Sequence, residues 1–253
     1  MTDSIARLPE NYQPAPELLK DRIILITGAG SGIGRSAALC FARHGATTIL
    51  LGRTMEKLEA VYDEIEAEGL PQPAIYPLNL EGATHADFES MCDVLDGEFG
   101  KLDGILHNAS ELGDRMTISD YAPDTWSRVM QVNVNAPFLL SKALLPLLDK
   151  SKAARIVFTG SSVGRKGRAY WGAYAASKAA QENLMQTLAD ELEDKNIGVN
   201  SINPGATRTA MRAAAYPAEN PDTLLTPEDL MPLYLYLISE DSEGVSGERF
   251  NAQ

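Results

Sequence analysis

The sequence predicts a single α/β domain with a doubly wound parallel sheet and helices on both faces. Three observations support this fold class. Short continuous apolar runs, typical of strands buried on both faces, alternate with segments whose apolar residues recur at helical spacing. The links between them are short, which favours parallel strands joined by right-handed crossovers. With 253 residues, 44% of them hydrophobic, the chain can bury one large core.

The first half of the chain repeats a strand–helix unit. Gly45 ends the first helix, because glycine readily adopts the conformation found just after helices. In the second helix, Leu58, Val61 and Ile65 share one face. In chain order, the patterns predict a strand at 22–27, a helix at 33–44, a strand at 47–51, a helix at 55–68, a strand at 74–78, a helix at 88–99 and a strand at 102–107.

The second half continues the alternation with longer helices. Residues 123–148 predict one helix that Pro137 and Pro146 should bend or shorten, since proline lacks the N–H that a helix interior uses. The remaining patterns predict a strand at 155–159, a helix at 173–192, a strand at 199–203, a helix at 227–238 and a last strand around Phe250.

No linker long enough to divide the chain is present. We therefore expect an N-terminal arm at residues 1–20 and one domain at residues 21–253. A segment near residues 210–226 is rich in Ala, Pro and Asn and has little periodicity. A loop of this length in a compact fold is usually functional, so we expect it to shape a binding site together with Tyr170 and Trp171.

The chain is acidic, with 22 Lys and Arg against 35 Asp and Glu and a formal net charge of −13. We expect neither nucleic acid nor membrane as a partner, because such a chain repels phosphate backbones and lacks basic clusters. No apolar window is long enough to span a bilayer, and the first 20 residues lack a secretory signal. Cys40 and Cys92 cannot form a disulfide framework, and we expect both to be buried and inert. These features predict a cytoplasmic protein.

A glycine-rich turn at residues 27–34 separates the first predicted strand from the first helix. Glycine allows a tight turn and lets a pyrophosphate approach the N–H groups at the start of a helix. This position between strand and helix is the context that a dinucleotide site requires. Arg35 follows Gly34 where a P-loop needs Lys and then Ser or Thr, so a P-loop is excluded.

Tyr174 and Lys178 stand four residues apart on a predicted helix and so share one face. An ammonium about 4 Å from a phenol favours the phenolate by roughly 4 kcal/mol at an effective dielectric of about 20. We therefore expect Lys178 to lower the pKa of Tyr174, by up to roughly three units from about 10. Such a tyrosine can donate or accept a proton near neutral pH.

The order of these motifs resembles that of the short-chain dehydrogenase/reductase family, in its single-domain branch. After the glycine turn come Asn108-Ala109, Asn133, Ser161, Tyr174, Lys178 and Pro204-Gly205. The resemblance covers about residues 21–250, and the stretches 130–136 and 171–178 are most similar to YciK-like bacterial oxidoreductases. It implies a Rossmann-type fold and an oxidoreductase that transfers hydride between NADP(H) and a small carbonyl or alcohol substrate.

The resemblance also implies a role for each matching residue. Tyr174 would be the acid or base, Ser161 would bond the substrate oxygen, and Lys178 would hold the nicotinamide ribose and bias Tyr174. Asn133 would hold a water of the proton relay on its backbone carbonyl. Besides Tyr174 and Lys178, the cofactor would be bound by Gly28, Ser31, Gly32, Ile33, Gly34, Arg53, Asn79, Leu80, Asn108, Ala109, Pro204, Gly205, Thr207 and Thr209.

Several positions depart from the family pattern. His107 and Ser110 replace the outer Asn and Gly of an Asn-Asn-Ala-Gly motif, whose outer positions support the sheet and line the cofactor floor. We expect His107 to lie near the cofactor. Asn79 stands where an acidic residue usually accepts a bond from adenine, and its side-chain oxygen can still accept one. The segment 245–250 lacks a common double glycine. None of these changes removes a catalytic residue.

The end of the second predicted strand favours one nicotinamide cofactor over the other. Gly52 occupies the position where a carboxylate would bind the ribose 2′-hydroxyl of NAD. Arg53 can instead pair with a 2′-phosphate through charge-assisted hydrogen bonds. We therefore expect NADP(H) rather than NAD(H).

Two other kinds of site are excluded, and one alternative function stays open. Residues 160–164 fit the Gly-x-Ser-x-Gly turn of serine hydrolases, but all three histidines precede Ser162, against the order such a triad needs. The histidines and cysteines lack metal-ligand spacing, so we expect no metal. A non-catalytic, dinucleotide-binding regulatory protein remains the alternative to an enzyme.

The helices predicted at 123–148 and 173–192 are apolar beyond one buried stripe, which indicates a second covered face. The residues concerned are Phe138, Leu139, Leu144, Leu147, Leu184, Met185 and Leu188. Because members of the family usually pair through these two helices, we expect a homodimer or a homotetramer.

Overall fold

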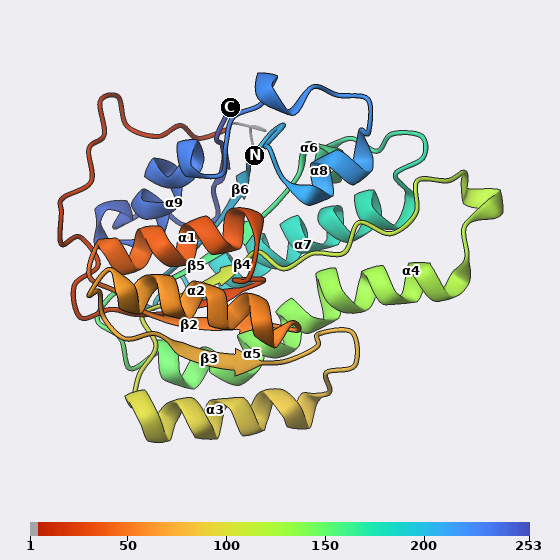
Figure 1. The fold of residues 1–253 in the computed structure, drawn as a ribbon. Helices are drawn as coiled ribbons and strands as arrows, with labels where there is room; N and C mark the ends of the chain where they lie inside the picture. The colour runs from red at the N-terminus through yellow and green to blue at the C-terminus, as the bar shows by residue number, and fades with distance from the viewer. Residues whose placement is uncertain (1–4) are drawn as a thin grey trace.

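The computed structural model describes residues 5–253; the first four residues of the expected N-terminal arm lie outside that range. Across the described residues, seven parallel strands form one sheet in the order β3-β2-β1-β4-β5-β6-β7 (Figure 1). The predicted fold class is confirmed. The strands are β1 (Ile23–Thr27), β2 (Thr47–Gly52), β3 (Ala74–Pro77), β4 (Gly104–His107), β5 (Ala154–Thr159), β6 (Ile197–Asn203) and β7 (Arg249–Asn251).

Alternate residues of a strand point to opposite faces of the sheet, and here both sets are apolar. Helices therefore cover both faces. Ile24, Ile26 and Leu50 pack into one core cluster, and Leu25, Ile49 and Leu51 pack into another. The first cluster includes side chains of α1 (Gly32–Arg43), α2 (Met55–Ala67) and α9 (Met231–Ile238). The second includes side chains of α3 (His85–Phe99), α5 (Ala136–Leu148) and α7 (Gly172–Glu191).

The long helix predicted at 123–148 is interrupted rather than bent. It consists of α4 (Pro123–Met130), a π-helical segment (Gln131–Asn135) and α5. Pro137 explains the interruption, because it has no N–H to donate to the carbonyl of Asn133, four residues earlier, as a regular α-helix would require. The wider turn occurs just before that proline, and Pro146 is accommodated inside α5.

Three other predictions about elements were wrong in part. The helix predicted at 88–99 begins at His85, because Thr84 and Asp87 form a reciprocal capping box. The segment expected as a loop near 210–226 contains a short helix, α8 (Ala210–Ala215), whose first turn is capped by Thr209. In the segment predicted as a helix at 227–238, only Met231–Ile238 forms the helix α9, because Glu228–Leu230 is a 3-10 turn.

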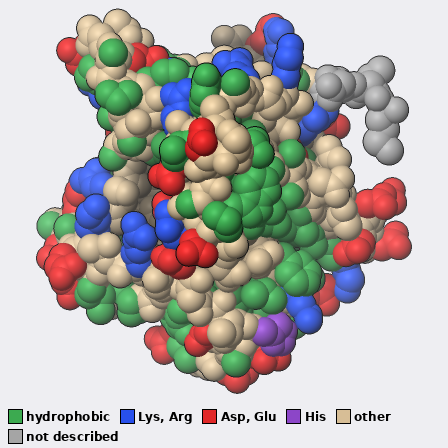
Figure 2. Space-filling view, turned by 90° about the vertical axis from the view of Figure 1, so that its right-hand side faces the viewer, with side chains coloured by type: hydrophobic (Ala, Val, Ile, Leu, Met, Phe, Trp, Pro, Cys, Tyr) green, Lys and Arg blue, Asp and Glu red, His purple; other side chains and the backbone are tan. Residues whose placement is uncertain are grey.

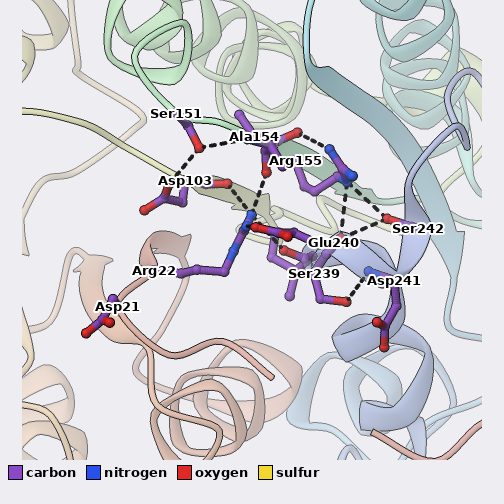
Figure 3. A network of polar contacts seen from close by, with 12 residues as sticks. Asp21, Arg22, Asp103, Ser151, Ala154, Arg155, Ser239, Glu240, Asp241 and Ser242 are labelled. Atoms are coloured by element: carbon purple, nitrogen blue, oxygen red, sulfur yellow. Dashed lines mark hydrogen bonds and ion pairs between the residues drawn. The ribbon is translucent and has the colours of Figure 1, made fainter. Parts of the chain in front are cut away.

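Two largely buried arginines hold the amino-terminal ends of the central strands together (Figure 3). The Arg22 guanidinium donates to the backbone carbonyls of Asp103, Ala153 and Ile238. Arg155 donates to the carbonyl oxygen of Ser239 and to the hydroxyl oxygen of Ser242. Burial alone would raise the pKa of the Asp103 carboxyl, but bonds from Lys101, Ser151 and the Ile23 N–H outweigh it and keep that pKa low. This network lies at the edge of the sheet opposite to the predicted site.

The described residues include no helix that is both long and apolar enough to cross a membrane.

Candidate active site

The predicted site residues gather around one cavity at the carboxyl ends of the strands. This edge is where open α/β sheets usually bind ligands. The cavity has a volume of about 560 Å³ and is lined from the ends of β1, β2, β4, β5 and β6. The side of the molecule drawn in Figure 2 shows a hollow with Lys and Arg side chains gathered along it. Of all residues expected to be catalytic or to bind the cofactor, only Gly34 and Asn133 do not line the cavity.

The glycine turn has the geometry of a close backbone approach. Gly28 and Gly32 have positive φ angles of 71° and 53°, which side chains rarely adopt. A Cβ on Gly34 would lie 2.2 Å from the carbonyl oxygen of Gly28 and 2.7 Å from Asn108 Nδ2. Gly34 therefore brings α1 close to the end of β1, whereas Gly28, Ser31, Gly32 and Ile33 face the cavity. The N–H groups that begin α1 are thereby available to a pyrophosphate.

The end of the cavity beyond β2 is cationic. Arg53 and Lys57 both line it, and neither forms an ion pair within the described part of the chain. Lys57 was not predicted from the sequence, although its place in the first turn of the helix after the strand is a signal that could have indicated it. Two cations and no carboxylate at this end suit the chemistry of a phosphate group.

The floor of the cavity is held by bonds between β1 and the segment after β4. Thr27 Oγ1 accepts bonds from the N–H groups of Asn108 and Ala109, each at 2.9 Å. Asn108 Nδ2 donates to the carbonyl of Thr27. Asn79 and Leu80 line the cavity nearby. Asn79 Oδ1 accepts a hydrogen bond from the N–H of Glu81, so one of its two lone pairs is used within its own turn and one is left for adenine.

Ser161, Tyr174 and Lys178 line the same cavity. Lys178 is buried on α7, and its Nζ donates to the carbonyl of Thr159 at 2.8 Å and to Gln181 Oε1 at 3.0 Å. That Nζ lies 5.7 Å from the centroid of the Tyr174 ring. Burial lowers the pKa of Lys178 to about 8, against the opposing charge of Glu182.

The expected lowering of the Tyr174 pKa by Lys178 is wrong for the protein alone. Burial raises the pKa of Tyr174 to about 12, and only bonds from Ser110 and Ser161 oppose the rise. The lysine has little influence because its ammonium is directed at Thr159 and Gln181 rather than at the phenol. Tyr174 therefore keeps its proton over the physiological pH range.

Asn133 is fully buried in the π-helical segment and joins three parts of the site. Its Oδ1 accepts from the Glu111 N–H at 2.8 Å and from Ser110 Oγ at 3.2 Å. Its Nδ2 donates to the carbonyl of Glu111 and to Ser177 Oγ, each at 2.9 Å. The side chain thus ties the segment after β4 to α7, the helix that carries Tyr174 and Lys178.

The segment after β6 closes the remaining side of the cavity, with Pro204, Gly205, Thr207 and Thr209 in its lining. Gly205 has a φ of 72°, so the chain turns there in the left-handed region. Thr207 Oγ1 donates to the carbonyl of Pro204. Thr209 caps α8 by accepting the Arg212 N–H at 3.2 Å. The turn and the cap fix this segment against the cavity.

The end of the cavity beside Tyr174 is aromatic. Trp171, Tyr174 and Tyr216 form a tilted ring cluster, and Leu112 lines the cavity beside it. Leu112 and Tyr216 were not predicted. Tyr170 was expected here but is absent from the lining, because a positive φ of 69° turns the chain and leaves its side chain 54% exposed.

His107 was expected near the cofactor, but it is buried beneath the cavity and does not line it. Its Nε2 lies 2.9 Å from Ser141 Oγ, and its ring stacks on Phe158. Burial, and then the positive charge of Lys178, lower the pKa of His107 to about 3. The imidazole is therefore neutral in the folded protein.

This burial predicts a pH dependence of stability. Because the folded pKa is about 3 and the unfolded pKa about 6.5, the unfolded chain binds the extra proton. The stability is fully present above pH 6.5 and falls as the pH drops toward 3. We expect the free energy of unfolding to fall by about 2 kcal/mol from this group between pH 8 and pH 5.

Denaturant unfolding at several pH values checks this expectation. The His107→Asn variant should lose the slope, whereas His85→Asn, an exchange at a partly exposed histidine, should keep it. An unchanged slope in His107→Asn would contradict the assignment.

No group of three metal-ligating side chains occurs among the described residues. Neither cysteine lines the cavity, and both are half-buried rather than buried. Burial raises the pKa of the Cys40 thiol to about 11 and also raises that of Cys92, so neither is a ready nucleophile.

Comparison with known proteins agrees with this geometry. The profile of the short chain dehydrogenase family matches residues 22–220. YciK, an uncharacterised oxidoreductase of Escherichia coli, is 54% identical over 243 residues, 96% of each chain.

Two solved structures are also similar over almost the whole chain. A short chain dehydrogenase from Shigella flexneri complexed with NADP is 54% identical, with a TM-score of 0.92, covering 94% of this chain and 100% of the other. One from E. coli CFT073 complexed with NADPH is 55% identical, with a TM-score of 0.93, covering 95% and 100%.

Proposed function

This chain belongs to the short-chain dehydrogenase family, and on that premise we propose that it transfers hydride between NADP(H) and a small carbonyl or alcohol substrate. One observation carries the proposal. Ser161, Tyr174 and Lys178 line the same cavity as the glycine turn and Arg53. One cavity therefore brings together the proton donor Tyr174, the hydroxyl of Ser161, which can bond a substrate oxygen, and the turn that can bind a dinucleotide.

The residues fit NADP(H) for two physical reasons. The turn at Gly28 and Gly32 offers bare backbone to a pyrophosphate. Arg53 and Lys57 offer cations to a 2′-phosphate, and Gly52 offers no carboxylate to a ribose hydroxyl. Relatives more than half identical to this chain were solved with NADP and NADPH, which supports the same choice.

The bound nicotinamide supplies the hydride, and the protein supplies orientation and the proton. In reduction, we expect Ser161 to donate a hydrogen bond to the carbonyl oxygen while Tyr174 gives that oxygen its proton. A phenol with a pKa of about 12 holds its proton until the oxygen becomes basic. Lys178, with a pKa of about 8, is mostly charged at neutral pH, and we expect its ammonium to hold the nicotinamide ribose beside Tyr174.

The proposal extends to the size and character of the substrate. Trp171, Leu112 and Tyr216 line the cavity beside Tyr174, which favours a compact, partly apolar carbonyl compound. The test is NADPH consumption over a panel of aldehydes and ketones. A regulatory protein would bind NADPH but consume none of it with any compound of the panel. That result would favour the non-catalytic, dinucleotide-binding regulatory protein over the enzyme.

We also propose that the protein is a homodimer or homotetramer, although part of the sequence argument for it was wrong. Leu144, Leu147, Met185 and Leu188 belong to the core of the single chain, because α5 and α7 already pack between the sheet and their neighbours. Phe138 on α5 and Trp126 on α4 remain 48% and 38% exposed. Aromatic side chains exposed on neighbouring helical segments suit contact with a second copy.

Light scattering should therefore report at least twice the chain mass of 27.4 kDa at micromolar concentration. Phe138→Glu should reduce that mass, since the exchange places a charge in the apolar contact. A wild-type particle of a single chain mass would contradict the assembly.

A further inference from the structure

We propose that Gln181 is a positioning residue for Lys178: together with the carbonyl of Thr159, its side-chain oxygen holds the ammonium so that one N–H is left for the nicotinamide ribose. The inference rests on the cofactor binding of the proposed function and deepens it. Gln181 does not line the cavity and was not expected in the site. It acts through Lys178, which precedes it by three residues on α7.

The ammonium of Lys178 is buried between two acceptors that the structure fixes. Its Nζ donates to the carbonyl of Thr159 at 2.8 Å and to Gln181 Oε1 at 3.0 Å. An ammonium has three N–H groups, so these bonds leave one N–H without an acceptor among the described residues. Lys178 lines the cavity, and this remaining N–H is therefore the one available to a ribose hydroxyl there.

Both acceptors are held by the fold. Thr159 is the last residue of β5 and is paired with Ile202 of β6, so its carbonyl has a fixed direction. Gln181 is almost fully buried on α7, one turn after Lys178. The ammonium is thus held from the sheet on one side and from its own helix on the other.

The other end of the Gln181 amide indicates why a glutamine is present. Its Nε2 is buried and has no hydrogen-bond partner in the part of the chain that the structure describes. A buried donor without a partner lowers stability, and an apolar side chain of similar size would avoid that loss. Stability alone therefore does not explain this residue, whereas the bond from its oxygen to Lys178 does.

The neighbouring carboxylate of Glu182 does not hold the ammonium in place of Gln181. Its Oε2 accepts from Ser201 Oγ at 2.8 Å, and its Oε1 has no hydrogen-bond partner within residues 5–253. The side chain that bonds Lys178 directly is thus a neutral amide. A neutral acceptor orients the ammonium without pairing its charge, which stays available to the cofactor.

The first test compares Gln181→Met, which keeps the length of the side chain but removes the acceptor, with Gln181→Glu, which keeps an acceptor. An ammonium bonded only to Thr159 can turn away on its flexible four-carbon stem. We expect Gln181→Met to weaken NADPH about tenfold, the order for loss of one hydrogen bond, and Gln181→Glu to stay within about threefold of wild type. NADH should weaken by the same factor as NADPH, because both carry the nicotinamide ribose.

The second test is a double-mutant cycle in which fluorescence titration follows NADPH. Lys178→Met should itself weaken NADPH, and adding Gln181→Met to it should weaken NADPH by less than about twofold further, because the amide then has no ammonium to hold. Gln186→Met, the same exchange at an exposed position of α7, is the matched control and should leave the affinity unchanged. The melting temperature of Gln181→Met should stay near that of wild type.

Three results would overturn the role of Gln181. They are an unchanged NADPH affinity in Gln181→Met, an equal loss in Gln181→Glu, and an equal effect of Gln181→Met with and without the lysine. The comparison of Met with Glu does not depend on the folding of Lys178→Met. Wild-type protein that binds NADPH but reduces none of the carbonyl panel would overturn the proposed hydride transfer and leave this inference, which binding alone measures, intact.

Discussion

Replacing Tyr174 by phenylalanine is expected to lower kcat by two to four orders of magnitude, the range for loss of a positioned proton donor. The exchange removes only the hydroxyl and leaves the ring contact with Trp171. NADPH affinity should stay within about twofold, because the glycine turn, Arg53 and Lys178 are untouched. Steady-state turnover of the best carbonyl compound, with a fluorescence titration of NADPH, measures both quantities.

The matched control makes the same chemical change away from the cavity. Tyr62 on α2 accepts a surface hydrogen bond from Gln72, so Tyr62→Phe removes a hydroxyl of the same kind. That variant should keep full turnover. Turnover of Tyr174→Phe within tenfold of wild type would show that another group donates the proton.

The second large effect concerns the 2′-phosphate. Arg53→Ala should weaken NADPH roughly 10- to 150-fold, the factor for one charge-assisted bond of about 1.5–3 kcal/mol, and leave NADH within about twofold. Lys57 remains at the same end of the cavity and limits the loss. Lys152→Ala, which removes an exposed cation between α5 and β5, is the control and should change neither affinity.

Gly52→Asp should go further than Arg53→Ala. The new carboxylate would repel the phosphate and accept from a ribose hydroxyl, so NADPH should weaken more while NADH tightens. The new Cβ would lie 3.1 Å from Leu58 Cδ2, so that flexible side chain must shift by a few tenths of an ångström. Wild-type preference for NADH, or equal weakening of both cofactors by Arg53→Ala, would refute the 2′-phosphate assignment.

The strands could be predicted from the sequence because burial on both faces produces continuous apolar runs, as in β1 and β5. The less predictable features depend on short-range bonding. The start of α3 depends on the Thr84 capping box, and the interruption before α5 depends on a single missing N–H at Pro137. α8 has only six residues, too few for a periodic pattern to be visible.

The residues of the candidate site also differ in whether a local sequence pattern indicates them. Tyr174 and Lys178 could be predicted because their spacing is local, on one helix face. Tyr216 reaches the cavity from a segment more than 40 residues away in the chain, and no local pattern indicates it. The predicted effect of Lys178 on the pKa of Tyr174 was wrong, because the spacing of the two residues along the chain does not show which groups the ammonium bonds.

The buried arginine network has a consequence for how this molecule can change. Arg22 and Arg155 join the starting ends of three neighbouring strands to the segment after α9, so the foundation of the sheet does not depend on the loops at its far edge. Those loops can therefore be exchanged, lengthened or redesigned for new substrates while the foundation keeps the strands aligned. The same separation makes Arg22 a poor target for engineering, since its burial ties several backbone segments to one side chain.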